Sequence, residues 1–172
     1  MRIAPITPGS NPDLAALEAR IAQARGRISP LYQVLLNSPP MAEGWEQLLS
    51  AVRNRSTLPA DLRELVILRV AVLNGAPYEF DAHVPHARAA GVPETLIEAL
   101  RLPSLNAIES LGPLQSSALR LTDQMTRDIQ VDPALMHQLA SSMEERQLLD
   151  LVVTIAAYNM VSRLLVALEV GH

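Results

Sequence analysis

The chain has 172 residues, a formal net charge of -4 and 49% hydrophobic residues, but only 3% aromatic residues. This length fits a single domain over residues 1–172 with a sizeable core, of which residues 1–10 form a flexible N-terminal segment. The apolar residues are mostly Leu, Ala, Val and Ile, which favours an all-α fold over a β-sandwich. Because the chain has no cluster of Lys and Arg and few aromatic residues for stacking, we expect no nucleic-acid partner.

The N-terminal sequence MRIAPITPGSNP lacks the apolar segment of a secretory signal. No apolar run approaches about 18 residues without a charged or strongly polar group, so we expect no contact with a membrane. These features predict a cytoplasmic protein. The chain contains no Cys, and cysteine usage therefore says nothing about its redox compartment.

Prolines mark where the helices of this chain begin. Proline fits the first position of a helix, where its missing N–H would have had no partner, and a preceding Asn or Ser offers a capping oxygen. Gly26, Asn74-Gly75 and Gly91 fall where left-handed caps end helices, and residues 103–113 form a looser connection. The predicted helices cover residues 13–25, 31–37, 40–54, 60–73, 78–90, 94–101, 114–129, 134–142 and 144–169.

Two of these segments, 62–75 and 148–160, are apolar on nearly every side. A helix of this kind has to be enclosed by other apolar surface. Two such helices in one small chain predict that part of this surface is buried between subunits. We therefore expect a homo-oligomer.

The bend over residues 74–76 joins two predicted helices into an αα-hairpin. In its second arm, Glu79, His83 and His86 are spaced i, i+4 and i+7, so they share one face. Glu64 lies about three turns before the bend, roughly level with the two histidines if the arms pack closely. Because an unpaired buried carboxylate costs several kcal/mol, Glu64 needs a partner, and a histidine of the adjacent arm is the natural one.

At these residues the chain resembles the carboxymuconolactone decarboxylase and alkyl hydroperoxidase D group. Peroxidase members carry a Glu, a CxxC pair and a His, and Glu64, Ala76, Glu79 and His83 have the same spacing, with Ala76 and Glu79 in the two Cys positions. The stretches LRELVILRVAVLNGAPYE and AHVPHARAAGVPE look like the long-form branch, and a weaker resemblance covers most of residues 40–170. The resemblance implies a multi-helix alkyl hydroperoxidase D-like bundle with a central αα-hairpin, assembled as a trimer or hexamer.

The departure from that pattern decides the expected chemistry. Neither the methyl group of Ala76 nor the carboxylate of Glu79 forms a thiolate, a sulfenic acid or a disulfide, which excludes thiol peroxidase chemistry. The decarboxylase side of the resemblance needs neither thiol nor cofactor. It implies a lyase or isomerase that moves protons on a small carboxylated lactone or β-keto-type acid. Loss of CO2 leaves an enolate, which needs an oxyanion stabiliser and a proton donor.

In this hypothesis the catalytic residues are His83, Glu64 and Glu79. His83 is the general acid/base, Glu64 orients it and keeps it basic, and Glu79 carries a second proton or orients the substrate. Arg69 is the nearest cation in sequence for a substrate carboxylate, although it lies about 140 degrees round the helix from Glu64. In an alternative interpretation, Arg69 forms a contact between subunits. The other predicted substrate-binding residues are Tyr78, His86, Asn159 and Arg163.

Three alternatives remain open at this point. The histidines and Glu79 could be structural, with Glu79 complementing the helix dipole and with Asn159 and Arg163 joining helices. A divalent metal could bind between the imidazoles and carboxylates of the hairpin, but this spacing is common by chance and we predict no metal. The chain could also be a non-catalytic oligomeric module that binds a ligand or partner, which the inert side chain of Ala76 favours.

Overall fold

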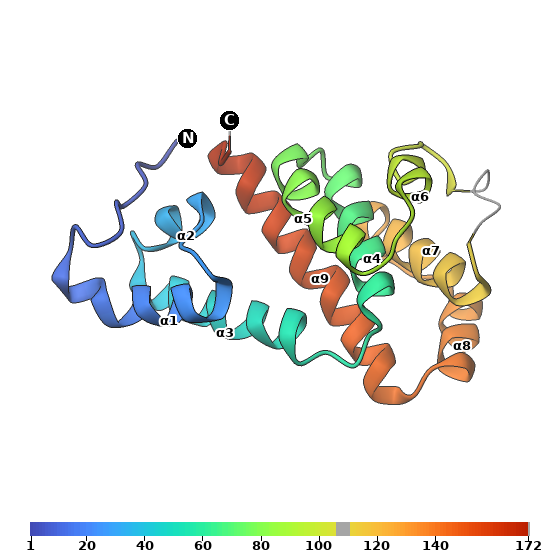
Figure 1. The fold of residues 1–172 in the computed structure, drawn as a ribbon. Helices are drawn as coiled ribbons and strands as arrows, with labels where there is room; N and C mark the ends of the chain where they lie inside the picture. Colours follow the sequence, from blue (N-terminus) through green and yellow to red (C-terminus); the bar gives the residue numbers. More distant parts are fainter. Residues whose placement is uncertain (106–110, 172) are drawn as a thin grey trace. The chain divides into compact units, whose positions relative to one another are not determined.

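The computed structural model describes residues 1–105 and 111–171, and this part of the chain is helical without any strand (Figure 1). The predicted helices are confirmed to within one or two residues at most ends, whereas residues 106–110 of the predicted connection 103–113 lie outside the described residues. The elements are η1 Pro12–Leu14, α1 Ala15–Arg25, α2 Pro30–Leu35, α3 Pro39–Asn54, α4 Ala60–Leu73, α5 Pro77–Ala89, α6 Glu94–Ala99, α7 Pro113–Arg127, α8 Pro133–Ser142 and α9 Glu145–Leu168.

Proline has the predicted role at the helix starts. Six elements, η1, α2, α3, α5, α7 and α8, carry a Pro in their first turn, where no N–H is needed. The prediction that Asn and Ser side chains cap the helices is confirmed only in part. The side chain of Asn11 accepts a hydrogen bond from the N–H of Asp13, but the side chains of Ser29 and Ser38 make no capping bond. The predicted left-handed glycines are confirmed, with φ of 76° at Gly26 and 84° at Gly91.

The chain forms two compact units, which we describe separately. The first unit comprises residues 1–55 together with the chain from Leu165 onward, and the second comprises Ser56–Leu164. In the first unit, the extended N-terminal segment is held by backbone hydrogen bonds from Ile6 N to Gln33 O and from Arg2 N to Leu168 O, both 2.9 Å. Its buried residues come from α1, α2 and α3.

The second unit is built round α4, whose residues from Glu64 to Ala71 are all buried. This arrangement agrees with the all-round apolar pattern of the segment, because α5 packs along α4 as the predicted antiparallel hairpin and α7 packs on another side (Figure 1). Burial of these apolar side chains is the main favourable contribution to the stability of the unit. Its core cluster consists of Leu65, Leu68, Ala71, Phe80, Ala87, Val92, Leu96, Ile97, Leu100 and Leu119.

The bend of the hairpin is tight and is fixed from outside. Gly75 has φ of 62°, a left-handed conformation that a side chain would strain. The side-chain amide of Asn74 donates to Oδ1 of Asn159 on α9 at 3.0 Å. Asn159 in turn donates to Oγ1 of Thr126 on α7 at 2.9 Å. The place where α5 begins is therefore set by contacts with α9 and, through it, with α7.

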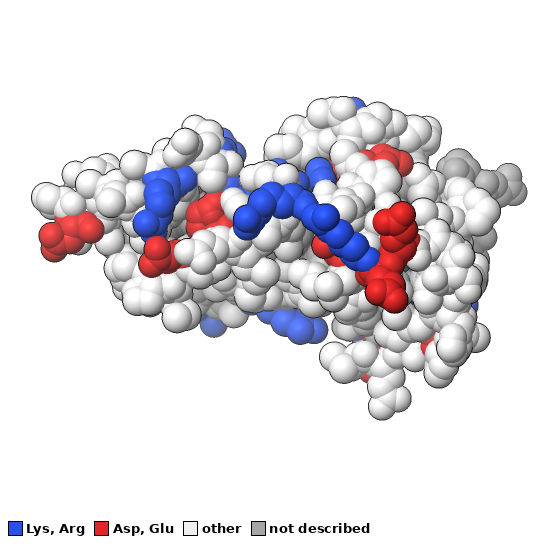
Figure 2. All heavy atoms as spheres, turned by 90° about the horizontal axis from the view of Figure 1, so that it is seen from below, with Lys and Arg blue, Asp and Glu red and all other residues white. Residues whose placement is uncertain are grey.

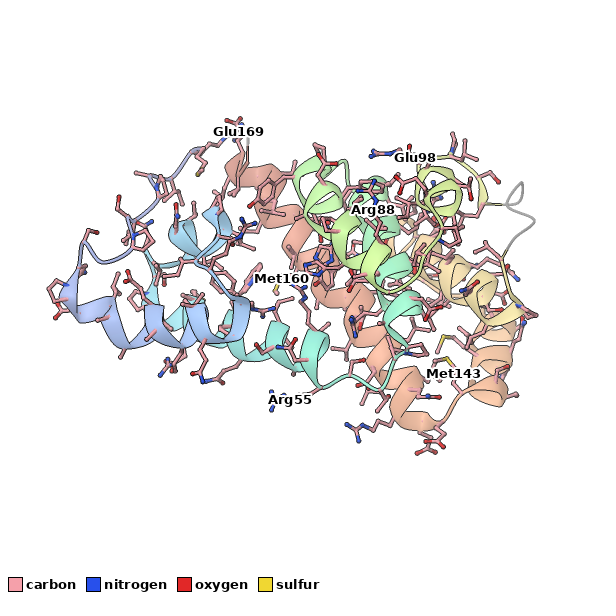
Figure 3. The ribbon with its side chains drawn as sticks, viewed as in Figure 1. Arg55, Arg88, Glu98, Met143, Met160 and Glu169 are labelled. Atoms are coloured by element: carbon pink, nitrogen blue, oxygen red, sulfur yellow. The ribbon has the colours of Figure 1, made fainter. Side chains whose placement is uncertain are left out.

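The far end of α5 is joined to α6 by an ion pair at the surface. The guanidinium of Arg88 donates to both carboxylate oxygens of Glu94, at 2.8 and 2.7 Å. Figure 3 shows Arg88 directed toward α6, with Glu98 close by. Because both partners are exposed, this pair contributes little to stability.

On the face drawn in Figure 2, acidic and basic groups are interspersed, and no single sign of charge covers it.

The last helix, α9, has the predicted length. It runs from Glu145 to Leu168, and by length and composition alone it is long and apolar enough to cross a membrane. Half of its most apolar stretch is buried inside the protein, and core helices of soluble proteins share this length and composition. Near its start, Asp150 accepts hydrogen bonds from the N–H and the hydroxyl of Thr57, both 2.7 Å, and so holds the segment that leads into α4.

Candidate functional site

The centre of the site is a hydrogen bond between the two arms of the hairpin. Oε2 of Glu64 on α4 lies 2.7 Å from Nδ1 of His83 on α5. Both side chains are buried, with 1% of Glu64 and 7% of His83 exposed. Antiparallel packing of the arms produces this contact, because it places a residue three turns before the bend beside one about two turns after it. In a buried environment, such a bond fixes the orientation of the imidazole ring.

Two aromatic rings surround His83. The ring of Tyr158 on α9 meets the imidazole edge to face, with 5.0 Å between ring centroids. The ring of His86 lies at 5.6 Å and is tilted by 55°. Tyr158 is buried, whereas His86 is exposed. The histidine is thus enclosed by α4, α5 and α9, with His86 on the solvent side.

Glu79 forms a second buried carboxyl in the first turn of α5. Only 2% of its surface is exposed, and the hydroxyl of Ser162 on α9 donates a short hydrogen bond to its Oε2. Its Oε1 is buried and makes no hydrogen bond with any residue in the described part of the chain. Burial raises the pKa of Glu79 to about 8, although the bond from Ser162 opposes the rise. At neutral pH, Glu79 is therefore mostly a neutral carboxylic acid.

Arg63 also lies at this centre. Its Nε lies 3.3 Å from Oε1 of Glu64, and 17% of its side chain is exposed. One carboxylate therefore contacts the guanidinium of Arg63 through Oε1 and the imidazole of His83 through Oε2. Sequence reasoning missed Arg63, because neighbouring residues of a helix point about 100 degrees apart and are not expected to meet.

The predicted substrate cation Arg69 lies elsewhere, and this is a correction. Its guanidinium is fully buried and forms a two-point ion pair with Asp123 on α7, at 2.7 and 2.8 Å. Its remaining N–H groups donate to backbone carbonyls of Leu100 and Leu102 at 2.7 Å and of Pro103 at 3.5 Å. All five donors of Arg69 have partners within the chain. Its geometry is that of a structural residue that joins α4 to α7.

The other predicted binding residues occupy different surroundings. Asn159 uses its amide for Asn74, Thr126 and the carbonyl of Ile155, so it connects helices. Arg163 is exposed on α9, one residue after the buried Ser162. Tyr78 is half-buried in the first turn of α5. The structure therefore brings together Glu64, His83 and His86, and it places Glu79 of α5 beside Ser162 of α9.

The positions of the two family cysteines have no sulfur. Ala76 is buried directly before α5, and Glu79 follows one turn later. Within residues 1–105 and 111–171, no three His, Asp or Glu side chains are placed to hold one metal ion. Tyr158 and Ser162 were not predicted, since they come from a helix about eighty residues further along the chain and carry no local signal.

Comparison with known proteins places this arrangement in a family. The sequence pattern of the carboxymuconolactone decarboxylase family matches residues 39–124, which is half of the chain and includes the whole hairpin. The chain belongs to the carboxymuconolactone decarboxylase family. This confirms the resemblance seen in the sequence, and with it the alkyl hydroperoxidase D-like fold.

Individual relatives are distant in sequence and close in fold. The uncharacterised protein YdfG of Bacillus subtilis is 29% identical over 116 residues, which cover 66% of this chain and 78% of YdfG. An uncharacterised peroxidase-related protein from Silicibacter has a TM-score of 0.81 at 16% identity and covers 96% of this chain and 87% of its own. A cysteine-to-alanine variant of the debrominase Bmp8, in complex with 2,3,4-tribromopyrrole, has a TM-score of 0.80 at 16% identity, covering 99% and 90%.

Proposed function

We propose that this protein is a cofactor-free lyase or isomerase that transfers protons on a small carboxylated lactone or β-keto-type acid. The observation that carries the proposal is the buried hydrogen bond between Glu64 and His83. When Nδ1 donates to the carboxylate, the neutral imidazole has its lone pair on Nε2, and this nitrogen acts as the base. The negative charge of Glu64 also stabilises the imidazolium that forms when Nε2 takes a proton.

Glu79 supplies the complementary acid. When Ser162 donates to Oε2, the proton of the neutral carboxyl resides on Oε1, which has no other partner among the described residues. A carboxylic acid with a pKa near the working pH is an efficient proton donor. His83 follows Glu79 by one helical turn, so base and acid lie on the same face of α5. One group removes a proton from the substrate, and the other protonates the enolate.

The absence of cysteine from the sequence separates this proposal from peroxidase chemistry. A peroxidase reaction of the family type needs a thiolate that is oxidised and then reduced. Proton transfer by His83, Glu64 and Glu79 needs no change of oxidation state. The proposal therefore uses the residues that this chain has in place of the thiols.

The test is a search for turnover with matched histidine variants. We expect wild-type protein to release CO2 from a β-keto acid, or to shift a double bond in a carboxylated lactone, as followed by proton NMR. His83→Ala and His83→Gln should each lower kcat by at least about 100-fold, the usual contribution of a general acid/base. His137→Ala removes an exposed histidine of α8 and should leave kcat unchanged. Unchanged turnover in both His83 variants would refute the assignment.

A non-catalytic ligand-binding protein is the second candidate. Ala76 favours it, because an inert methyl group occupies a position of the redox motif. The Bmp8 variant gives further support, since it holds 2,3,4-tribromopyrrole with an alanine in place of a cysteine. Saturable binding of a small acid without any turnover by wild-type protein would favour this candidate. In both cases we propose a homo-oligomer, a trimer or hexamer, which light scattering during size-exclusion chromatography measures directly.

A further inference from the structure

We propose that Arg63 binds the substrate carboxylate, and that the carboxylate it binds is retained in the product. This inference rests on the proposed proton-transfer function and names the cation that the site requires. Arg63 lies one residue before Glu64 on α4 and contacts Oε1 of the same carboxylate that holds His83. A ligand group bound to Arg63 is therefore next to the carboxylate that holds the imidazole.

The guanidinium of Arg63 has donors to spare. Its only polar contact with residues in the described ranges 1–105 and 111–171 is the 3.3 Å contact from Nε to Glu64. This distance is longer than the 2.7–2.9 Å typical of a charge-assisted hydrogen bond. Its two terminal nitrogens are left for a ligand, and a guanidinium edge matches a carboxylate in a two-point contact. With 17% of the side chain exposed, the group is partly desolvated and still accessible.

Four other arginines in this unit are already engaged. Asp123 and backbone carbonyls occupy Arg69 completely, and the same Asp123 is 3.7 Å from Arg127. Arg88 forms a two-point pair with Glu94, and Arg101 pairs with Glu98 at 3.2 Å. The contacts of these four arginines are with Asp123, Glu94, Glu98 and backbone carbonyls. Arg63 contacts Glu64 itself, and this contact makes it the cation that we assign to a substrate at the pair of Glu64 and His83.

The charge balance of the cluster agrees with an anionic ligand. Glu64 is offset by Arg63, and Glu79 is mostly neutral at pH 7 because burial raises its pKa to about 8. A second ionised carboxylate would repel an acid from the site, and this cluster avoids that repulsion. These side chains therefore present no uncompensated negative charge to a substrate carboxylate that binds Arg63.

The chemistry of decarboxylation decides which carboxylate Arg63 holds. When a β-keto acid loses CO2, the electron pair of the broken C–C bond moves to the ketone as an enolate, and the enolate carbon then takes a proton. Negative charge therefore leaves the departing carboxylate. A cation on that group would stabilise the ground state more than the transition state and slow the reaction. A carboxylate bound to Arg63 is consequently one that remains, either in a diacid or in an acid that isomerises.

Binding tests the first half of the proposal. The probes are paraconate, a stable carboxylated lactone, and its methyl ester, titrated into wild-type protein by calorimetry. We expect the acid to bind at least about tenfold more tightly than the ester, as for one charge-assisted contact. Arg63→Gln should abolish this preference, Arg63→Lys should restore part of it, and Arg120→Gln, an exposed control on α7, should retain it. Equal binding of acid and ester, no saturable binding of the acid by wild type, or an unaltered preference in Arg63→Gln overturns the assignment.

Turnover tests the second half. Oxaloacetate loses one carboxylate and keeps another, whereas acetoacetate loses the only one it has. We expect wild-type protein to have at least a tenfold higher kcat/KM for oxaloacetate, and Arg63→Gln to remove this advantage mainly by raising KM. A preference for acetoacetate that depends on Arg63 overturns the claim of a retained carboxylate. Absence of turnover with both acids overturns this claim and the decarboxylase form of the proposed function, whereas lactone isomerisation and the calorimetric result for Arg63 are tested separately.

Discussion

Glu64 and His83 are nineteen residues apart in the chain, yet their side chains meet at 2.7 Å inside the protein. Both residues are buried, and the bond joins a carboxylate to an imidazole nitrogen. This relationship links the fold to the proposed chemistry. It also means that substitutions at either position change stability as well as activity.

Removal of Glu64 should therefore be costly in the absence of any substrate. We expect Glu64→Ala to lower the free energy of unfolding by about 2–4 kcal/mol, since it removes the carboxylate that is hydrogen-bonded to the buried imidazole of His83. Urea denaturation followed by circular dichroism measures this loss. Glu98→Ala, at an exposed position of α6, should change stability by no more than about 0.5 kcal/mol. If the double variant with His83→Ala loses the full sum of both single losses, the two residues are not coupled.

The buried carboxyl of Glu79 predicts a dependence of stability on pH. Its pKa is about 8 in the folded protein and near the ordinary value of 4.5 in the unfolded chain. Between these pH values the folded state keeps a proton that the unfolded state has lost. With respect to this group, the free energy of unfolding is therefore highest below pH 4.5 and falls as pH rises toward 8. The ceiling of this loss is roughly 5 kcal/mol.

Glu79→Gln checks that sign, because the amide keeps the shape and does not titrate. The difference in unfolding free energy between wild type and the variant should shift in favour of the variant as pH rises from 5 to 8. Glu98→Gln serves as the exposed control, whose difference from wild type should stay nearly constant over the same range. A pH-independent difference for Glu79→Gln would show that this carboxyl is ionised in the folded protein.

Asp150 should act in the opposite direction at acid pH. Burial opposes its ionisation, but hydrogen bonds from the backbone and the hydroxyl of Thr57 outweigh burial and lower its pKa. We expect Asp150→Asn to cost about 1–3 kcal/mol at pH 7. This difference should vanish as pH falls below 3.8 through the lowered pKa of the folded state, where Asp150 itself is protonated. Thermal unfolding of both proteins at several acid pH values measures it, and a difference that persists at the lowest pH would contradict the assignment.

The pair of Arg69 and Asp123 should prove structural. Asp123→Ala leaves a fully buried guanidinium without its anion, so we expect a loss of about 3–5 kcal/mol in unfolding free energy. Asp128→Ala, at the exposed end of the same helix, is the matched control and should cost less than about 0.5 kcal/mol. A stable Asp123→Ala protein that loses only substrate affinity would contradict this assignment and indicate that Arg69 binds the substrate.

The sequence was sufficient for the parts of the fold that depend on neighbours in the chain. Prolines and glycines locate the helix ends because they act through their own backbone geometry. The hairpin followed from a short bend between two helices, and the meeting of Glu64 and His83 followed from counting turns on its two arms. These features need only a few tens of residues.

Contacts between distant segments were not accessible in this way. Asp123 lies 54 residues beyond Arg69, and nothing in the local sequence says that these two residues meet. The contacts of Ser162 with Glu79 and of Tyr158 with His83 were not predicted for the same reason. The contact of Arg63 with Glu64 depends on how a long side chain bends along the helix surface, which spacing alone does not determine.

The hydrogen bond from Ser162 to Glu79 has a consequence for the newly made chain. These partners are 83 residues apart, so the ribosome finishes the hairpin long before it finishes α9. Until the last helix emerges, Glu79 lacks its hydroxyl partner from α9, and the proposed acid of the site is not yet in its final surroundings. Synthesis of the final segment is thus the event that completes the site, and a chain released early keeps the Glu64 and His83 arms without the helix that supplies Ser162 and Tyr158.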